Sequence, residues 1–325
     1  MPEAGPLLQI EHLTKVFRRG WLRGPKDLCA VDNLSLTVPK GAVYGFLGPN
    51  GAGKSTTLRM ALGLIHPTQG RVSIGGHDVA HACLQALRRV GAFVESPSFY
   101  NYLPGRRNLE LLSGLSGGAS SEEIDGILER VGLQGRADDR VKVYSHGMRA
   151  RLGLAACLLP CPELLILDEP TDGLDPHGIH EVRNLIRSLA ADDGLTVFLS
   201  SHMLGEVENL CTHIAIIDHG RLIVEGELEA LERQHRRWCL ETTRTTEAMG
   251  VLAERLGLDA ASAPKHPNVL QLSLDGKPPE EIVAALSEGG VPIRSFSPEA
   301  NWLDRLFLEL TSTHEADHAQ PKEVA

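Results

Sequence analysis

The segment GPNGAGKS at residues 48–55 constrains this chain more than any other part of its sequence. It follows the short apolar run Val43–Leu47 and precedes a stretch with apolar residues at helical spacing from Leu58 to Ile65. Glycines let successive backbone N–H groups converge on an anion without a clashing Cβ, and the N-terminus of the following helix carries partial positive charge. A strand, a glycine-rich turn and a helix in this order predict a nucleoside triphosphate site.

The residues of this turn have different expected roles around a polyphosphate. We expect Lys54 to reach the β- and γ-phosphates, and the hydroxyl of Ser55 to ligate Mg²⁺. A chance glycine-rich turn is the alternative, and the flanking strand and helix argue against it. The predicted nucleotide-binding residues are Gly48, Pro49, Asn50, Gly51, Ala52, Gly53, Lys54, Ser55 and Thr56.

Two adjacent acids end a second apolar run. Leu164–Leu167 is followed directly by Asp168 and Glu169. A buried strand ends in this way where its carboxylates face a site at the carboxyl edge of a sheet. Asp168 is then placed to hold Mg²⁺, and Glu169 to orient and deprotonate an attacking water. Alone, the pair could equally be two solvated residues; the phosphate-binding turn favours the catalytic interpretation.

Short apolar runs alternate with helical patterns over the first two thirds of the chain. This alternation predicts an α/β fold with a mostly parallel sheet covered by helices on both faces. Leu7–Phe17 and Val31–Val38 are expected to form an opening antiparallel piece, and residues 96–160, which have few strand signals, a helical insertion. Further buried strands are expected at residues 164–167, 196–200 and 214–217.

The last third has a different pattern. After a charged boundary at ERQHRR, strand-like and helix-like segments mix within about 75 residues, which predicts a small α+β domain. We therefore expect a nucleotide-binding domain at residues 1–232, an accessory domain at 237–312 and a flexible tail at 313–325.

Composition excludes several classes of protein. The net charge of −10 disfavours a broad nucleic-acid-binding surface, which needs clustered Lys and Arg. An uninterrupted apolar run long enough to span a bilayer is absent from the sequence, and the first residues do not resemble a secretory signal. The six cysteines form no CxxC pair and are expected to be reduced.

Three further motifs follow the phosphate-binding turn in a characteristic order. They are YSHGMR at residues 144–149, DEPTDGLDP at residues 168–176 and SSH at residues 200–202. Together with the turn they resemble the ABC ATPases, over a region from Leu7 to about Glu229. The resemblance implies the P-loop NTPase fold, ATP as ligand, and active sites shared between two nucleotide-binding domains.

The resemblance also implies roles for individual residues. Phe17 is placed like the family's aromatic residue that stacks on adenine, although an ordinary core phenylalanine is an equal alternative. His202 matches the residue that contacts the γ-phosphate and the attacking water. Ser145 and Gly147 match residues that contact ATP held by the opposite subunit, and Asp175 matches a residue of the dimer interface.

The chain departs from the family pattern in an informative way. Glu95 stands where the family has Gln, and we expect it to reach Mg²⁺ or the attacking water; His146 and Met148 replace the Gly and Gln of the family's LSGGQ sequence. These features and the extra C-terminal domain resemble the bacitracin-resistance and lantibiotic-immunity branch, whose members energise separate membrane subunits that export antibiotics or peptides.

We therefore expect an ATP-hydrolysing subunit that works as a homodimer at the cytoplasmic face of the membrane, peripheral to a separate integral-membrane permease. A soluble ABC ATPase acting on the ribosome or on DNA is the alternative, but such proteins carry two nucleotide-binding halves or a long coiled coil. A P-loop kinase or GTPase would not need the motifs at residues 144–149 and 200–202.

Overall fold

The computed structural model describes residues 5–18, 27–94, 98–263 and 266–318. Contacts divide the chain into two compact units, residues 1–228 and residues 229–325. The division falls just before the predicted boundary at residue 232. Each unit is described by itself below.

The first unit opens with an antiparallel sheet in the order β2-β1-β4-β5. Leu8 of β1 pairs with Val38 on one side and with Ile74 on the other. The sequence pattern does not predict β4 and β5, because β4 exposes half of its residues and lacks an apolar run. The bounds are β1 Leu8–Phe17, β2 Leu28–Val38, β4 Gln69–Ile74 and β5 His77–Asp78.

The second sheet of this unit is mainly parallel, in the order β10-β9-β3-β8-β7-β6. Every residue of β3, β7 and β8 is buried, as expected for inner strands covered on both faces. Only β10 pairs antiparallel, at the edge. The bounds are β3 Val43–Leu47, β6 Val90–Phe93, β7 Leu164–Asp168, β8 Thr196–Ser201, β9 His213–Asp218 and β10 Arg221–Glu227.

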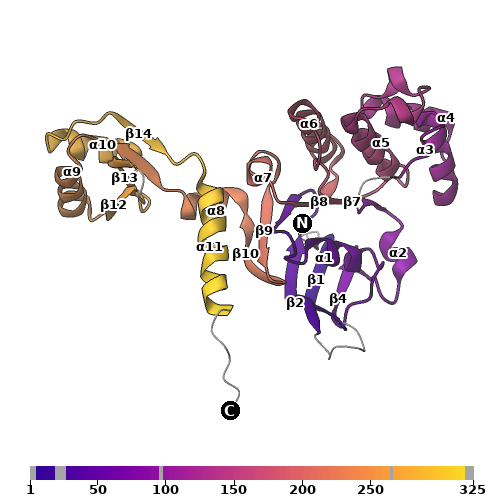
Figure 1. The fold of residues 1–325 in the computed structure, drawn as a ribbon, viewed down its shortest axis with the longest axis horizontal. Coiled ribbons are helices and arrows are strands. Elements are labelled where there is room, and N and C mark those ends of the chain that lie inside the picture. Colours follow the sequence, from indigo (N-terminus) through magenta and orange to yellow (C-terminus); the bar gives the residue numbers. More distant parts are fainter. Residues whose placement is uncertain (1–4, 19–26, 95–97, 264–265, 319–325) are drawn as a thin grey trace, which may run out of the picture. The chain divides into compact units, whose positions relative to one another are not determined.

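Helices cover the parallel sheet, and α1 lies between the two sheets. Leu58 and Met60 of α1 share one core with Leu8 of β1 and Phe46 of β3. The helices α6 and α7 pack on β8, and α7 also contacts β3 (Figure 1). The bounds are α1 Lys54–Ala61, α2 Cys83–Leu87, α6 Pro176–Asp193 and α7 Leu204–Leu210.

Between β6 and β7 the chain forms the predicted helical region. Helices α3, α4 and α5 contact one another beside the sheet (Figure 1). Ser120 and Glu123 form a capping box at the start of α4. The bounds are α3 Gly105–Ser113, α4 Ser121–Arg130 and α5 His146–Leu158, with 3₁₀ turns at Gly114–Ser116, Gln134–Arg136 and Val141–Val143.

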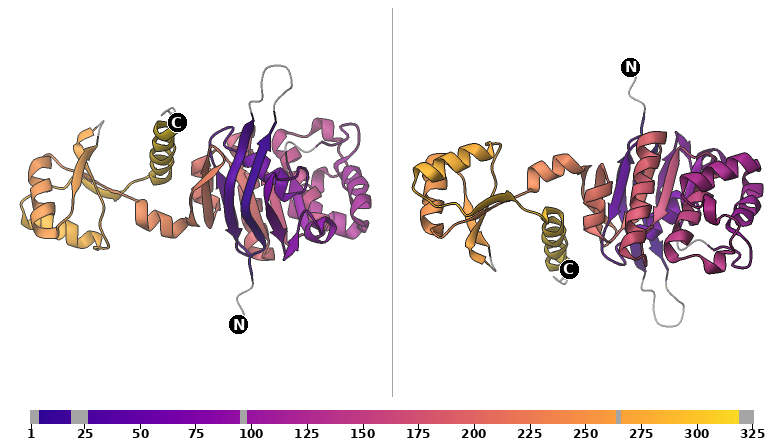
Figure 2. Two further views of the ribbon diagram at one scale, coloured as in Figure 1. Left: turned by 90° about the horizontal axis from the view of Figure 1, so that it is seen from below. Right: turned by 90° about the horizontal axis from the view of Figure 1, so that it is seen from above.

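The second unit contains an antiparallel sheet in the order β12-β13-β11-β14, with its own core around Leu240, Leu270 and Ile282 (Figure 2). The last helix continues to His318, so residues 313–318, which were expected to belong to a flexible tail, are helical. Residues 319–325 lie outside the described part. The bounds are α8 Leu228–His235, β11 Trp238–Glu241, α9 Thr245–Val251, a π-helix Leu252–Leu256, β12 Ala260–Ala263, β13 His266–Leu272, α10 Pro279–Glu288, β14 Ser295–Pro298 and α11 Trp302–His318.

Among the helices that the structure describes, none is both long and apolar enough to cross a lipid bilayer.

Candidate active site

The glycine-rich turn joins β3 to α1, and its backbone geometry explains its glycines. Gly53 precedes α1 at a φ of 105°, and a Cβ there would lie 2.4 Å from the carbonyl oxygen of Ala30. A Cβ on Gly48 would lie 2.5 Å from the carbonyl oxygen of Ile217. Because α1 has no side-chain cap, its first backbone N–H groups are left for an anion.

The ammonium group of Lys54 lies between this turn and the end of β7. Its side chain is only 6% exposed, and Nζ donates to the carbonyl oxygens of Gly48 at 2.7 Å and Pro49 at 3.3 Å. The same Nζ lies 3.4 Å from Oε1 of Glu169. Lys54 therefore links the turn to the predicted catalytic acid. Ser55 and Thr56 follow it on the first turn of α1, both half-buried.

The two acids at the end of β7 are held by a hydroxyl on the neighbouring strand. Ser200 of β8 pairs in register with Asp168. Its Oγ donates to Oδ1 of Asp168 at 2.5 Å and accepts the backbone N–H of Glu169 at 3.0 Å. The sequence motifs assign no separate role to Ser200. The one sign of it in the sequence is that this serine follows an apolar run, as Asp168 and Glu169 follow theirs.

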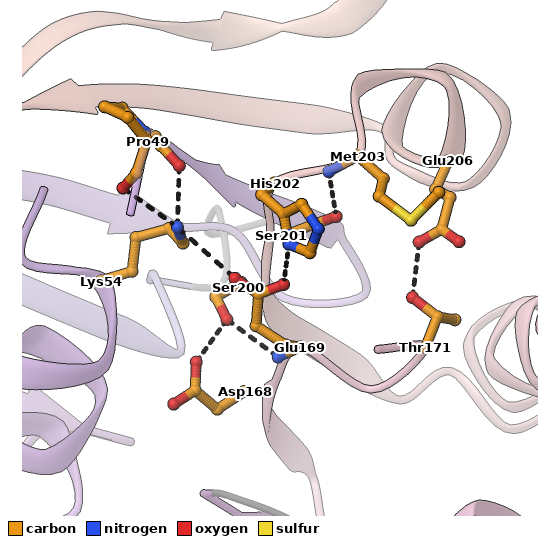
Figure 3. Close-up of polar contacts among 11 residues, drawn as sticks. Pro49, Lys54, Asp168, Glu169, Thr171, Ser200, Ser201, His202, Met203 and Glu206 are labelled. Carbon is orange, nitrogen blue, oxygen red and sulfur yellow. Dashed lines mark hydrogen bonds and ion pairs between the residues drawn. The ribbon is translucent and has the colours of Figure 1, made fainter. Parts of the chain in front are cut away.

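Each carboxylate oxygen of Glu169 contacts a different side chain. Oε1 faces Lys54, and Oε2 hydrogen-bonds Nδ1 of His202, which follows β8 (Figure 3). The backbone of Glu169 is left-handed, at a φ of 51°, a conformation that costs energy in any residue with a Cβ. Such strain is typical of functional sites, and here it places the carboxylate between two predicted site residues.

The residues predicted to meet a partner subunit lie at two adjoining helix ends. Ser145 caps α5 by accepting the N–H of Met148 at 3.2 Å. Asp175 caps α6 in the same way, accepting from Gly178 at 2.7 Å. A Cβ on Gly147 would lie 3.4 Å from Cα of Gly178, so the two helix N-termini are in close contact.

Phe17 ends β1 and is 37% exposed, which does not fit the alternative of a core phenylalanine. The ammonium of Lys15 lies 5.1 Å from the centre of its ring. Glu95 lies outside the described residues.

Comparison with known proteins decides the family. Residues 31–172 match the profile of the ABC transporter family. The chain is 48% identical over 209 residues to the bacitracin transport ATP-binding protein BcrA of Bacillus licheniformis, covering 64% of this chain and 68% of that protein. It is 38% identical over 305 residues to the daunorubicin/doxorubicin resistance ATP-binding protein DrrA of Streptomyces peucetius, covering 91% and 92%. This chain belongs to the ABC transporter ATP-binding proteins.

The solved structures agree with this ABC ATPase assignment. A structure of an ATP-binding subunit of an ABC transporter superposes with a TM-score of 0.59 at 29% identity, covering 70% of this chain and 92% of that one. The predicted α/β P-loop fold and ATPase family are thereby confirmed. For this ABC ATPase, ATP is the nucleotide.

The residues present also fit Mg²⁺. In nucleotide sites Mg²⁺ takes one or two carboxylates together with phosphate oxygens and waters. Ser55 supplies a hydroxyl and Asp168 a buried carboxylate. The described part of the chain has no cluster of three or more His, Cys, Asp or Glu side chains that could bind a metal ion. A magnesium site of this kind does not need one, because phosphate oxygens and waters supply the other ligands.

Proposed function

We propose that this ABC ATPase energises the export of a drug, antibiotic or peptide through a separate integral-membrane permease. Its relatives support this: besides BcrA and DrrA, it is 39% identical over 227 residues to the lantibiotic transport ATP-binding protein SrtF of Streptococcus pyogenes. These names favour transport over action on the ribosome or DNA. The subunit would bind the permease peripherally, at the cytoplasmic face of the membrane.

The position of Glu169 between Lys54 and His202 carries the proposed hydrolytic mechanism. With ATP in the turn, Lys54 binds the β- and γ-phosphates, and Glu169 is freed to accept a proton from the attacking water. His202 orients that water and the γ-phosphate. Mg²⁺, held by Ser55 and Asp168, would neutralise charge on the phosphate oxygens.

A second copy of the chain would complete each site. The N-terminus of α5, with Ser145 and Gly147, is suited to the γ-phosphate of ATP on the partner subunit. Phe17, exposed at the end of β1, is suited to stacking on adenine. We propose Glu95 as a further ligand of Mg²⁺ or of the water.

Transport measured in vesicles tests this function. The chain is co-expressed with an integral-membrane protein that co-purifies with it, and inside-out vesicles are tested for ATP-dependent uptake of bacitracin and daunorubicin. Lys54→Ala is expected to abolish uptake and ATP turnover because it removes the buried phosphate contact. Lys40→Ala, which removes an exposed lysine paired with Glu163 at 3.6 Å, should leave both intact. Equal uptake with both variants would contradict the proposal.

A further inference from the structure

Four residues after His202, helix α7 carries a buried carboxylate that the proposed hydrolytic mechanism does not use. Glu206 on α7 is only 9% exposed. Its Oε2 accepts a hydrogen bond from the hydroxyl of Thr171 at 2.5 Å. Its Oε1 is shielded from solvent and has no hydrogen-bond partner among the described residues. A buried polar atom without a partner is costly, and such atoms call for a functional explanation.

The Thr171–Glu206 hydrogen bond joins the two segments that carry the hydrolytic residues. Thr171 lies two residues after Glu169, and Glu206 lies four residues after His202. The strands before them, β7 and β8, are parallel neighbours, so both segments leave the same edge of the sheet. The contact between Glu169 and His202 is one link between these segments, and Thr171–Glu206 is a second (Figure 3).

The backbone on either side of this second link is firmly held. The N–H of Met203 donates to Oγ of Ser201 at 2.9 Å, and the N–H of Glu206 donates to the carbonyl oxygen of Met203 at 3.1 Å. In the other segment, the N–H of Asp172 donates to the carbonyl oxygen of Glu169 at 3.1 Å. These hydrogen bonds connect Glu206 to Met203, which follows His202, and connect Asp172, which follows Thr171, to Glu169.

We propose that Glu206 and Thr171 are positioning residues that set His202 against Glu169 for hydrolysis. Neither side chain touches the nucleotide in this scheme; each acts through the loop that it anchors. The inference rests on the proposed roles of Glu169 and His202. It predicts that loss of the hydrogen bond lowers the rate of hydrolysis and leaves ATP binding unchanged, because the phosphate-binding turn is not disturbed.

Steady-state ATP hydrolysis by the full chain, with Mg²⁺ present, tests the proposal. Thr171→Val keeps the side-chain volume and removes the hydroxyl, and should lower kcat about tenfold or more with KM for ATP within about twofold. Glu206→Ala should act in the same direction. Thr171→Ser and Glu206→Gln, which keep a donor and an acceptor, should restore kcat to within about threefold of the unmodified chain.

Tyr44→Phe is the matched control. Tyr44 is also buried, and its hydroxyl donates to the carboxylate of Glu225 at 2.6 Å. Tyr44 pairs with Phe198 of β8, four residues before His202, and contacts neither His202 nor Glu169 through this hydrogen bond. This variant loses the same type of hydrogen bond and should lose comparable thermal stability while keeping kcat. If Thr171→Val lowers kcat no more than Tyr44→Phe does, the positioning role is wrong.

A double-mutant cycle separates this role from a general loss of stability. If Thr171 acts through His202, adding Thr171→Val to His202→Ala should lower kcat by less than about twofold further. The same tenfold loss in both backgrounds would overturn the proposal. Failure of the proposed hydrolytic mechanism can be distinguished from failure of the positioning role. In that case Glu169→Gln would hydrolyse ATP as fast as the unmodified chain, whatever the effect of Thr171→Val.

Discussion

The hydroxyl of Ser200 donates a hydrogen bond to Oδ1 of Asp168 at 2.5 Å, and both side chains are buried. Oγ of Ser200 also accepts the backbone N–H of Glu169 at 3.0 Å. One hydroxyl therefore holds both the proposed metal ligand and the proposed base to the neighbouring strand. The orientation of the acids depends on β8 as much as on β7, which carries Asp168.

Ser200→Ala should lower the free energy of unfolding by about 1–3 kcal/mol, because it leaves a buried carboxylate oxygen and a buried N–H without their partner. Urea denaturation followed by circular dichroism measures the change. Ser188→Ala is the control: its hydroxyl donates to the carbonyl oxygen of Leu185 on an exposed face of α6, and its loss should cost less than about 0.5 kcal/mol. Equal losses would contradict a structural role for Ser200.

Glu169→Gln should keep ATP binding and reduce hydrolysis at least about 100-fold, because the amide cannot accept the proton of the attacking water. Binding is measured by titration calorimetry and turnover by phosphate release. Glu163→Gln is the control, since Glu163 pairs with Arg89 and Lys40 before the start of β7, and it should hydrolyse ATP normally. Undiminished turnover by Glu169→Gln would remove Glu169 from the mechanism.

Gly53→Ala should destabilise the fold by about 1–3 kcal/mol and prevent ATP binding, because its Cβ meets the carbonyl oxygen of Ala30 at a left-handed φ. Thermal unfolding and nucleotide titration check both effects. Gly51→Ala shares the positive φ, at 86°, but its Cβ would meet nothing within 4 Å. Gly51→Ala should therefore lose less stability than Gly53→Ala. An equal loss of stability in the two variants would contradict a clash between the new Cβ at residue 53 and the carbonyl oxygen of Ala30.

Alkylation should distinguish Cys157 from Cys161. Burial raises the pKa of the Cys157 thiol to about 12, so at pH 8 only about one molecule in ten thousand carries the reactive thiolate. Cys161 is exposed. Iodoacetamide followed by mass spectrometry should modify Cys161 in the folded chain and Cys157 only after denaturation. Modification of Cys157 in the folded chain at the same rate as Cys161 would contradict the burial of Cys157.

The fold could be predicted where strands are buried on both faces. Runs such as Val43–Leu47 and Leu164–Leu167 are apolar throughout because neither face meets water, and they became β3 and β7. The strands β4, β10 and β12 were missed, because half-exposed residues give a weaker pattern. Their pairing depends on partners far away in the sequence.

The chemistry of this protein can be read from its residue types and their spacing. A glycine-rich turn between a strand and a helix, two acids after an apolar run, and the motifs at residues 144–149 and 200–202 identified the family and its nucleotide, because those residue types are required at those spacings. Tertiary structure decided which side chains meet. The contact of Glu169 with His202, the role of Ser200 and the buried Thr171–Glu206 pair all arise because β7 and β8 lie side by side. That adjacency follows from sheet packing, which local sequence patterns do not encode.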